Sequence, residues 1–345
     1  MAAAYVGRLR RLSELEDLEI SLEYSSRALE LTPHGPPDLP DRHSNLGRCY
    51  ADLFKQLGEL DDLEGAIEHD YSALTLTPGG HPNLSDRHAN LGKTYARRFD
   101  RLGEAGDLEM AIEHRHRALN LTPQGHPILS DWYADLGYSY PVRFRPQNEL
   151  DGLEQSIEYL SFALASTPDG HPDLSSRHAD LGSSCIYRSH CWGELKDLEK
   201  GTEHEFHGLA LTPDGHPGLP RRHFDQAIIS LLWYHHTGEF SYLMSSADSF
   251  RRAPQLLTGA PRDRFSYALR LAEVASSHSP LNFIEAYQTT VDLLPQFVWL
   301  GATTSQRYQD LSIAENLAVN AASVAISSSE LELALEWLEH TRCVV

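Results

Sequence analysis

The sequence predicts an all-α protein, built as an α-α superhelix of antiparallel helix pairs. The first observation is a period of 45 residues that separates five Thr-Pro pairs, at Pro33, Pro78, Pro123, Pro168 and Pro213. The second is that Leu-Glu and Leu-Gly pairs recur at the same step, and the third is that apolar residues follow helical spacing within each copy. Such copies favour an array in which each unit packs on its neighbours.

Each copy predicts two helices. In one of them, apolar and small residues fall at helical spacing over residues 88–99 and again over residues 108–119. Ser85 and Asp86 precede the first run and are the expected N-terminal cap. The second helix should end before Pro123, because the residue before a proline is pushed out of the α region.

Six recurring positions resemble the tetratricopeptide repeat (TPR) signature. In one copy they are Leu91, Gly92, Tyr95, Ala111, Ala118 and Pro123, and one copy earlier they are Leu46, Gly47, Tyr50, Ala66, Ala73 and Pro78. The usual TPR is 34 residues long, so the extra residues here belong to the turn within a repeat and the loop between repeats. The resemblance covers residues 1–221, which we interpret as five TPR-like repeats with the first one truncated, and it implies a TPR-like solenoid.

Beyond residue 221 the 45-residue step fails, but helical spacing continues. Gln226 and Ala227 stand where a Leu-Gly pair is expected, and the Thr-Pro punctuation is lost. The expected pairs are 222–237 with 239–256, 261–277 with 280–294, and 304–326 with 329–343. Residues 222–345 are therefore predicted to form divergent TPR-like helical pairs.

The long repeat also resembles the TPR arrays of fungal proteins that carry a CHAT domain, a caspase-like cysteine peptidase module. The phrase LTPDGHP and the tail LELALEWLEHTRCVV carry this resemblance. It implies that residues 222–345 lead toward a C-terminal domain that this sequence lacks. The alternative function is then the regulatory N-terminal arm of a CHAT cysteine peptidase, in intramolecular contact with that domain.

Composition restricts the partners. The 345-residue chain carries a net charge of −20, which argues against nucleic acid and anionic membranes, because both reward clustered Lys and Arg. No apolar run approaches the length of a membrane helix, and the N-terminus lacks the features of a secretory signal, so we expect a cytoplasmic protein. The cysteines form no C-x-x-C pair and are expected to be reduced; they are Cys49, Cys185, Cys191 and Cys343.

Two repeats depart from the pattern. Pro141 falls inside an expected helix, where proline costs about 3 kcal/mol, so that helix is predicted to break near Tyr140. Gly201 and Gly208 occupy the two small positions of a second helix, each about 1 kcal/mol less favourable than Ala. The helix pairs at both places are predicted to have low local stability.

Histidines supply the main candidate chemistry. Eight of the nineteen recur at equivalent places, which are His81, His126, His171 and His216 before a proline, and His43, His88, His178 and His223 before the Leu. Recurrence favours loop hydrogen bonds and packing, and Tyr133 replaces one member of the second set. The competing hypothesis, a metal-dependent enzyme built on these histidines, predicts bound zinc in the purified protein.

Other motifs fall short of a catalytic site. His204 and His207 are spaced i and i+3, whereas a zinc-peptidase helix needs i and i+4. Histidine also stands at the place of His204 in earlier repeats, which suggests a copied surface residue. His190 and Cys191 are adjacent on a helix and so do not face each other. Without a Walker loop, a dinucleotide motif or a nucleophile elbow, we expect no cofactor and no catalysis.

A polar ladder is the predicted binding surface. Asn45, Asn90, Asp135 and Asp180 each precede a Leu-Gly pair, on the helix that lines the groove in TPR arrays. An amide can both donate to and accept from a peptide backbone, whereas a carboxylate only accepts. Flanking candidates are Arg48, Asp52, Lys93, Arg97, Tyr138 and Tyr187. The ladder predicts a non-catalytic scaffold that binds a protein or peptide; solvated or capping side chains are the alternative.

Overall fold

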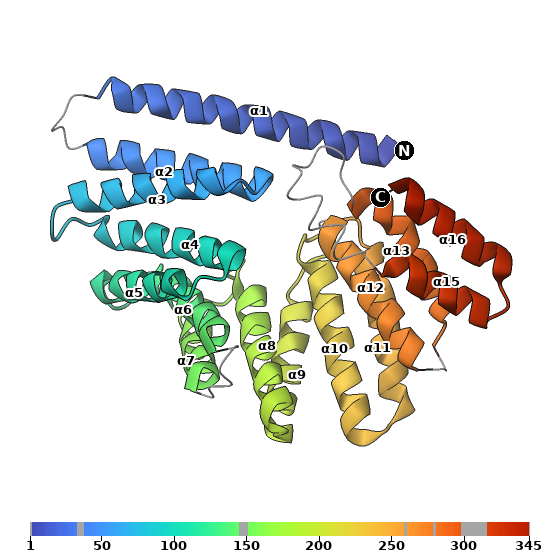
Figure 1. Ribbon diagram of the computed structural model, residues 1–345. Coiled ribbons are helices and arrows are strands. Elements are labelled where there is room, and N and C mark those ends of the chain that lie inside the picture. Colours follow the sequence, from blue (N-terminus) through green and yellow to red (C-terminus); the bar gives the residue numbers. More distant parts are fainter. Residues whose placement is uncertain are drawn as a thin grey trace. The chain divides into compact units, whose positions relative to one another are not determined.

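A computed structural model describes residues 2–32, 38–144, 151–258, 261–278, 281–297 and 316–344. The chain divides into two compact units, Met1–Asp169 and Gly170–Val345, and each is described by itself. Within the described ranges, every regular element is a helix (Figure 1). The predicted all-α fold class is therefore confirmed. Among these residues we find no helix whose length and apolar character would suffice to cross a membrane.

The first unit consists of successive helix pairs that follow the chain. Its helices are α1 (Ala2–Glu30), α2 (Leu39–Leu57), α3 (Leu60–Leu76), α4 (Leu84–Leu102), α5 (Ala105–Leu121), α6 (Leu129–Phe144) and α7 (Asp151–Ala165). Helices α2 and α3, α4 and α5, and α6 and α7 pack as pairs, and each pair also packs on the next (Figure 1). The predicted two helices per 45-residue copy are confirmed for the three copies that contain α2 to α7, whereas α1 is a single helix.

The second unit continues with the same kind of pair. Its helices are α8 (Leu174–Trp192), α9 (Leu195–Ala210), α10 (Leu219–Thr237), α11 (Phe240–Gln255), α12 (Pro261–Ser277), α13 (Phe283–Phe297), α15 (Leu317–Ser327) and α16 (Leu331–Val344). The pairs expected beyond residue 221 are observed as α10 with α11, α12 with α13, and α15 with α16. Residues 304–315 of the last expected pair lie outside the described residues.

In four of the pairs a glycine follows the first helix. Gly58, Gly103, Gly193 and Gly238 each follow a first helix in the left-handed conformation, with φ between 71° and 74°. Glycine adopts this conformation without a steric penalty. The equivalent residue of the first repeat is Ser13, and there α1 continues as one helix of 29 residues. The first repeat thus lacks both this glycine and the turn between two helices.

The loops between repeats are fixed by histidine. The Nδ1 atoms of His81, His126, His171 and His216 each accept a hydrogen bond from the backbone N–H two residues later, at 3.0 to 3.3 Å. Helix α4 then begins at Leu84 with Asn83 at its N-cap, and no side-chain cap bond is made. The cap predicted at Ser85 and Asp86 was wrong, because both residues lie in the first turn of α4.

Helix α6 does not break at Pro141 as predicted; it continues to Phe144. Proline has no N–H, so the carbonyl of Gly137, four residues earlier, lacks its usual helical donor. The hydroxyl of Ser156 on α7, which is fully buried, donates to that carbonyl at 2.8 Å. Ser156 stands where Ala66 and Ala111 stand in earlier repeats, so the serine compensates for the proline.

Ser156→Ala is expected to lower the free energy of unfolding by about 1 kcal/mol more than Ser246→Ala. Ser246 makes the same 2.8 Å bond to the carbonyl of Ala227, but Leu231 follows there in place of proline and can supply the helical N–H. Urea unfolding of the two variants tests this difference. Equal losses would show that the serine does not compensate for Pro141.

Candidate functional site

A polar cavity of about 380 Å³ lies on the first helices of the first unit, and we call it the first cavity. Most of its lining comes from α2 and α4, and Trp132 of α6 and the buried Asp70 of α3 complete it. The lining residues on α2 and α4 are Ser44, Gly47, Arg48, Ala51, Asp52, Asp86, Arg87, Asn90, Lys93, Thr94 and Arg97. Their polar groups suit recognition of a backbone and of charged side chains.

Asp70 is a buried carboxyl group at the base of the first cavity. Only 3% of the residue is exposed, and burial raises its pKa to about 6, although a hydrogen bond from Thr94 and the charges of nearby arginines act in the opposite direction. The Thr94 hydroxyl donates to Asp70 at 2.9 Å. The glycine of the Leu-Gly pair explains why this carboxyl fits, because a Cβ at Gly47 would overlap it.

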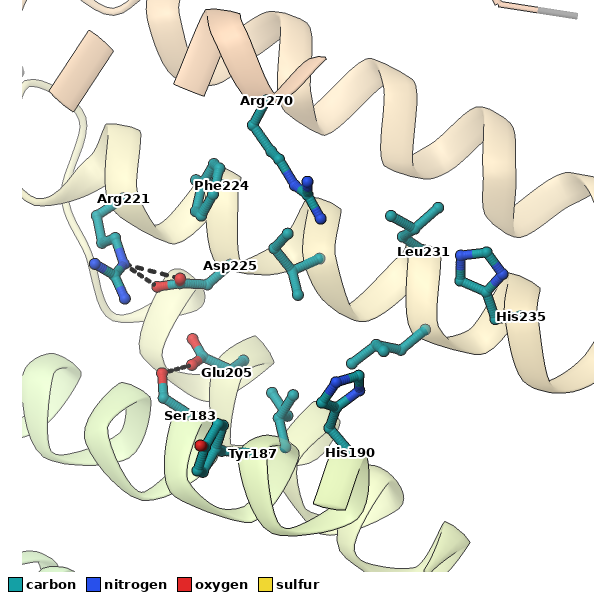
Figure 2. A pocket seen from close by; sticks show the side chains of 13 residues that line it. Ser183, Tyr187, His190, Glu205, Arg221, Phe224, Asp225, Leu231, His235 and Arg270 are labelled. Atoms are coloured by element: carbon teal, nitrogen blue, oxygen red, sulfur yellow. Dashed lines mark hydrogen bonds and ion pairs between the residues drawn. The ribbon is translucent and has the colours of Figure 1, made fainter. Parts of the chain in front are cut away.

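A second cavity of about 450 Å³ lies within the second unit (Figure 2). Its walls are α8 and α10, with Arg270 of α12 at one side and Glu205 of α9 at the base. The lining residues on α8 and α10 are Ser183, Ile186, Tyr187, His190, Arg221, Phe224, Asp225, Ile228, Leu231, Leu232 and His235. Most of this wall is apolar, in contrast to the first cavity.

The two cavities occupy the same place in the repeat. A shift of 135 residues, three 45-residue steps, relates Arg48 to Ser183, Ala51 to Ile186, Asp52 to Tyr187, Asp70 to Glu205, Asp86 to Arg221, Asn90 to Asp225, Lys93 to Ile228 and Arg97 to Leu232. Both have a buried carboxyl group from a second helix at the base. Lysine and arginine in the first cavity are replaced by isoleucine and leucine in the second.

The predicted site residues are distributed over these cavities. Arg48, Asp52, Asn90, Lys93 and Arg97 come together at the first cavity, and Tyr187 lines the second. Asn45 accepts a hydrogen bond from Arg48 at 2.8 Å and lines a small neighbouring cavity against α1.

The remaining predicted residues lie on first helices outside the cavity linings. Asp135 forms an ion pair with Lys93 at 3.5 Å, which links it to the first cavity. Tyr138 is exposed on α6, and Asp180 is partly buried on α8. The Lys93 ammonium also lies 5.3 Å from the centre of the Trp132 ring, so its charge is held by two residues of α6.

Sequence reasoning missed the residues at the base of each cavity. Asp70 and Glu205 are buried on second helices, whereas the predicted site residues all lie on first helices. Asp225 was missed because the Leu-Gly pair that marks the ladder is absent after it, yet the 45-residue step from Asp180 leads to it. His190 was considered only with Cys191; the structure places it in the wall of the second cavity.

The recurring histidines on helices form pairs within a repeat. Nδ1 of His88 lies 2.9 Å from Nδ1 of His114, and the same contact measures 3.1 Å in the pairs His43 with His69 and His178 with His204. In the next repeat, Tyr133 and Tyr159 occupy the places of His88 and His114, and their rings stack. His204 is therefore a partly buried packing residue, and the prediction of a copied surface residue was wrong.

Burial determines the charge state of these histidines. It is the largest cause of the lowered pKa of both residues in each pair, and in the His88 pair it lowers the pKa of His88 to about 4. A neutral pair can form the contact, since one Nδ1–H donates to the other Nδ1. In the described ranges, no group of three or more His, Cys, Asp or Glu side chains is arranged to hold a metal ion.

Comparison with known proteins gives structural likeness only. No family model and no curated protein matches the chain. RapI in its apo form is 12% identical and aligns over 88% of this chain and 97% of its own, with a TM-score of 0.51. The TPR protein TTC0263 of Thermus thermophilus is 18% identical over 69% of this chain and 99% of its own, with a TM-score of 0.46. The C-terminal part of a TPR protein of Cytophaga hutchinsonii is 11% identical over 86% and 99%, with a TM-score of 0.49.

At these identities the likeness concerns the fold alone. It agrees with the helix pairs of each unit and with the signature residues that recur every 45 positions. The resemblance to fungal CHAT-associated arrays stays a prediction from the sequence. The chain has an all-α, TPR-like fold of antiparallel helix pairs.

Proposed function

We propose that this chain is a non-catalytic scaffold that binds a protein or a peptide on the face formed by the first helices of its pairs. The supporting observation is that each unit carries a cavity at the same place in the repeat. Within one unit, neighbouring packed helices lie about 8 to 10 Å apart, close to the length of three extended residues, which suits an extended peptide.

The chemistry of the first cavity favours a polar segment. The amide of Asn90 can both donate to and accept from a peptide backbone. Arg48, Lys93 and Arg97 add positive charge to the same walls. The second cavity combines an apolar wall with the buried carboxyl group of Glu205, so it suits a side chain with an apolar stem. The net charge of −20 agrees with protein partners rather than nucleic acid.

Arg97→Glu is expected to weaken peptide binding by about tenfold or more, because it reverses a charge in the wall of the first cavity. The measurement is selection of peptides from a random library by the full chain, followed by fluorescence polarisation of the selected peptides with each variant. Arg117→Glu is the matched control, since Arg117 is exposed on α5, where it pairs with Glu113.

The control should bind selected peptides as the unaltered chain does. Equal weakening by both variants would place binding away from the first cavity. Failure to select any peptide, or turnover of a substrate by the purified chain, would contradict the proposed function itself.

A further inference from the structure

The second cavity contains a buried acceptor without a partner. Glu205 is 1% exposed, and its Oε1 accepts a hydrogen bond from the Ser183 hydroxyl at 2.8 Å (Figure 2). Its Oε2 is also buried, and within the described part of the chain it has no hydrogen-bond partner. A buried carboxyl oxygen without a hydrogen-bond partner is costly, and a partner molecule could satisfy this atom.

The nearby cations are directed to Asp225 rather than to Glu205. The Nε atom of Arg221 donates to both carboxylate oxygens of Asp225, at 2.8 and 3.0 Å, and a guanidinium nitrogen of Arg222 lies 3.9 Å from the same group. Arg270, on α12, reaches the cavity but pairs with Glu273 at 2.8 Å. From α8, Ser183 binds Oε1, and His190 lies in the cavity wall. Among the described residues, no cation is thus in direct contact with Glu205.

We propose that the second cavity binds a lysine side chain of a partner protein, with the ammonium on Oε2 of Glu205 and the aliphatic stem along Ile186 and Ile228. This inference rests on the proposed function and specifies its partner. Ile186, Ile228 and Glu205 all line this cavity, and Oε2 of Glu205 is buried without a hydrogen-bond partner among the described residues. The net charge of −20 also favours the approach of a basic segment.

Lysine fits better than arginine for a geometric reason. A guanidinium binds a carboxylate through two parallel hydrogen bonds, whereas an ammonium is a compact charge that one oxygen can accept. Oε1 is already occupied by Ser183, so one oxygen of Glu205 remains. The four-carbon stem of lysine also buries readily along apolar surface.

Proton release should accompany binding. Burial raises the pKa of Glu205 to about 8, with the charge of Asp225 as a further cause, while Ser183, Arg222 and Arg221 act in the opposite direction. The carboxyl therefore holds a proton near neutral pH when the cavity is free, and an incoming ammonium displaces it. Affinity for an alkylammonium ion is expected to rise as the pH increases from about 6 to about 8.

The first test uses the lysine side chain alone. n-Butylammonium is titrated into the full chain at pH 8 and followed by NMR of the methyl groups of Ile186 and Ile228, with 1-butanol as the uncharged control. The ammonium is expected to bind about ten- to a hundredfold more tightly than the alcohol, the range for a charged hydrogen bond in a buried site. Equal binding of the two probes, or no perturbation of these methyl groups, would overturn the proposal.

Glu205→Gln should remove the preference for the ammonium and the pH dependence, while it keeps the size of the side chain. Asp70→Asn is the matched control, because Asp70 occupies the equivalent place in the first cavity, and it should leave the preference unchanged. If Glu205→Gln does not fold, the unaltered chain still provides a test of the lysine site. Calorimetry in buffers of different ionisation enthalpy measures the protons that it releases when n-butylammonium binds. No proton release would reject the proposal.

A peptide library with one fixed central residue separates this inference from the proposed function. Peptides with central lysine should be retained about tenfold or more over those with norleucine, which has the same stem without the charge. Selection of peptides with no preference for lysine would contradict the lysine site and leave the scaffold function standing. Absence of any selected peptide would reject both.

Discussion

Gly201→Ala is expected to lower the free energy of unfolding by about 1 to 3 kcal/mol, the usual cost of overpacking. A Cβ at this place would lie 2.5 Å from Cγ1 of Ile186 and 3.0 Å from the carbonyl oxygen of Gly182. The first is a buried side chain and the second is backbone, so neither can move aside easily. Helix propensity alone predicts the opposite sign, a gain of about 1 kcal/mol. Urea unfolding, with hydrogen exchange of α8 and α9, measures the change.

The sequence shows why glycine is needed at this place. In two earlier repeats the facing residues are both alanine, Ala51 with Ala66 and Ala96 with Ala111, whereas here the larger Ile186 faces Gly201. The double variant Ile186→Ala with Gly201→Ala restores the alanine pair. It should be less destabilised than the sum of the two single variants.

Gly106→Ala provides the control for propensity. Gly106 lies in the first turn of α5, and a Cβ there would meet nothing within 4 Å. Its substitution is expected to stabilise the chain by about 1 kcal/mol or less. If Gly201→Ala also stabilised the chain, or if its cost simply added to that of Ile186→Ala, close packing would not be the reason for the glycine.

The helix pairs could be predicted from the sequence because a 45-residue step repeats the same contacts. Leu63, Leu91 and Leu136 recur in the sequence and are all fully buried. The step also places the polar ladder on first helices, since Asn90 lies on α4 and Asp180 on α8. Periodicity therefore determines which face of a helix a residue occupies.

Periodicity does not determine what a buried position contains. The second-helix place beneath the Leu-Gly pair holds Asp70, Arg115, Leu160 and Glu205 in successive repeats, and all four are buried. Three of these are charged, and charged residues are rarely buried. The nearby glycine leaves room for them, and hydrogen bonds such as Ser183 to Glu205 support them. These contacts come from different repeats or helices, and one repeat alone does not reveal them.

The paired histidines should make the chain less stable in acid. His88 and His114 are 7% and 4% exposed, and burial is the largest cause of their lowered pKa values, about 4 for His88. Between that pH and about 6.5, the unfolded chain binds protons at these histidines that the folded chain does not bind, so stability falls as the pH decreases. Asp70 and Glu205, whose pKa values are raised, contribute with the opposite sign.

A double variant isolates the contribution of the histidine pair. His88→Tyr with His114→Tyr copies the Tyr133 and Tyr159 pair, whose rings stack at 6.3 Å in the equivalent place. Between pH 7 and pH 5, the unaltered chain is expected to lose about 2 kcal/mol more than this variant, measured by urea unfolding at each pH. The carboxyl groups are present in both proteins, so their contribution cancels in the comparison.

The reciprocal exchange tests the same cause from the other side. Tyr133→His with Tyr159→His places a histidine pair between α6 and α7, where burial should again favour the neutral form. This variant is expected to become more sensitive to acid than the unaltered chain. Because the two exchanges alter the same contact in opposite directions, a general effect of aromatic size cannot produce opposite changes in the pH dependence. Parallel pH profiles for all three proteins would show that the histidine pairs pack without titrating in this range.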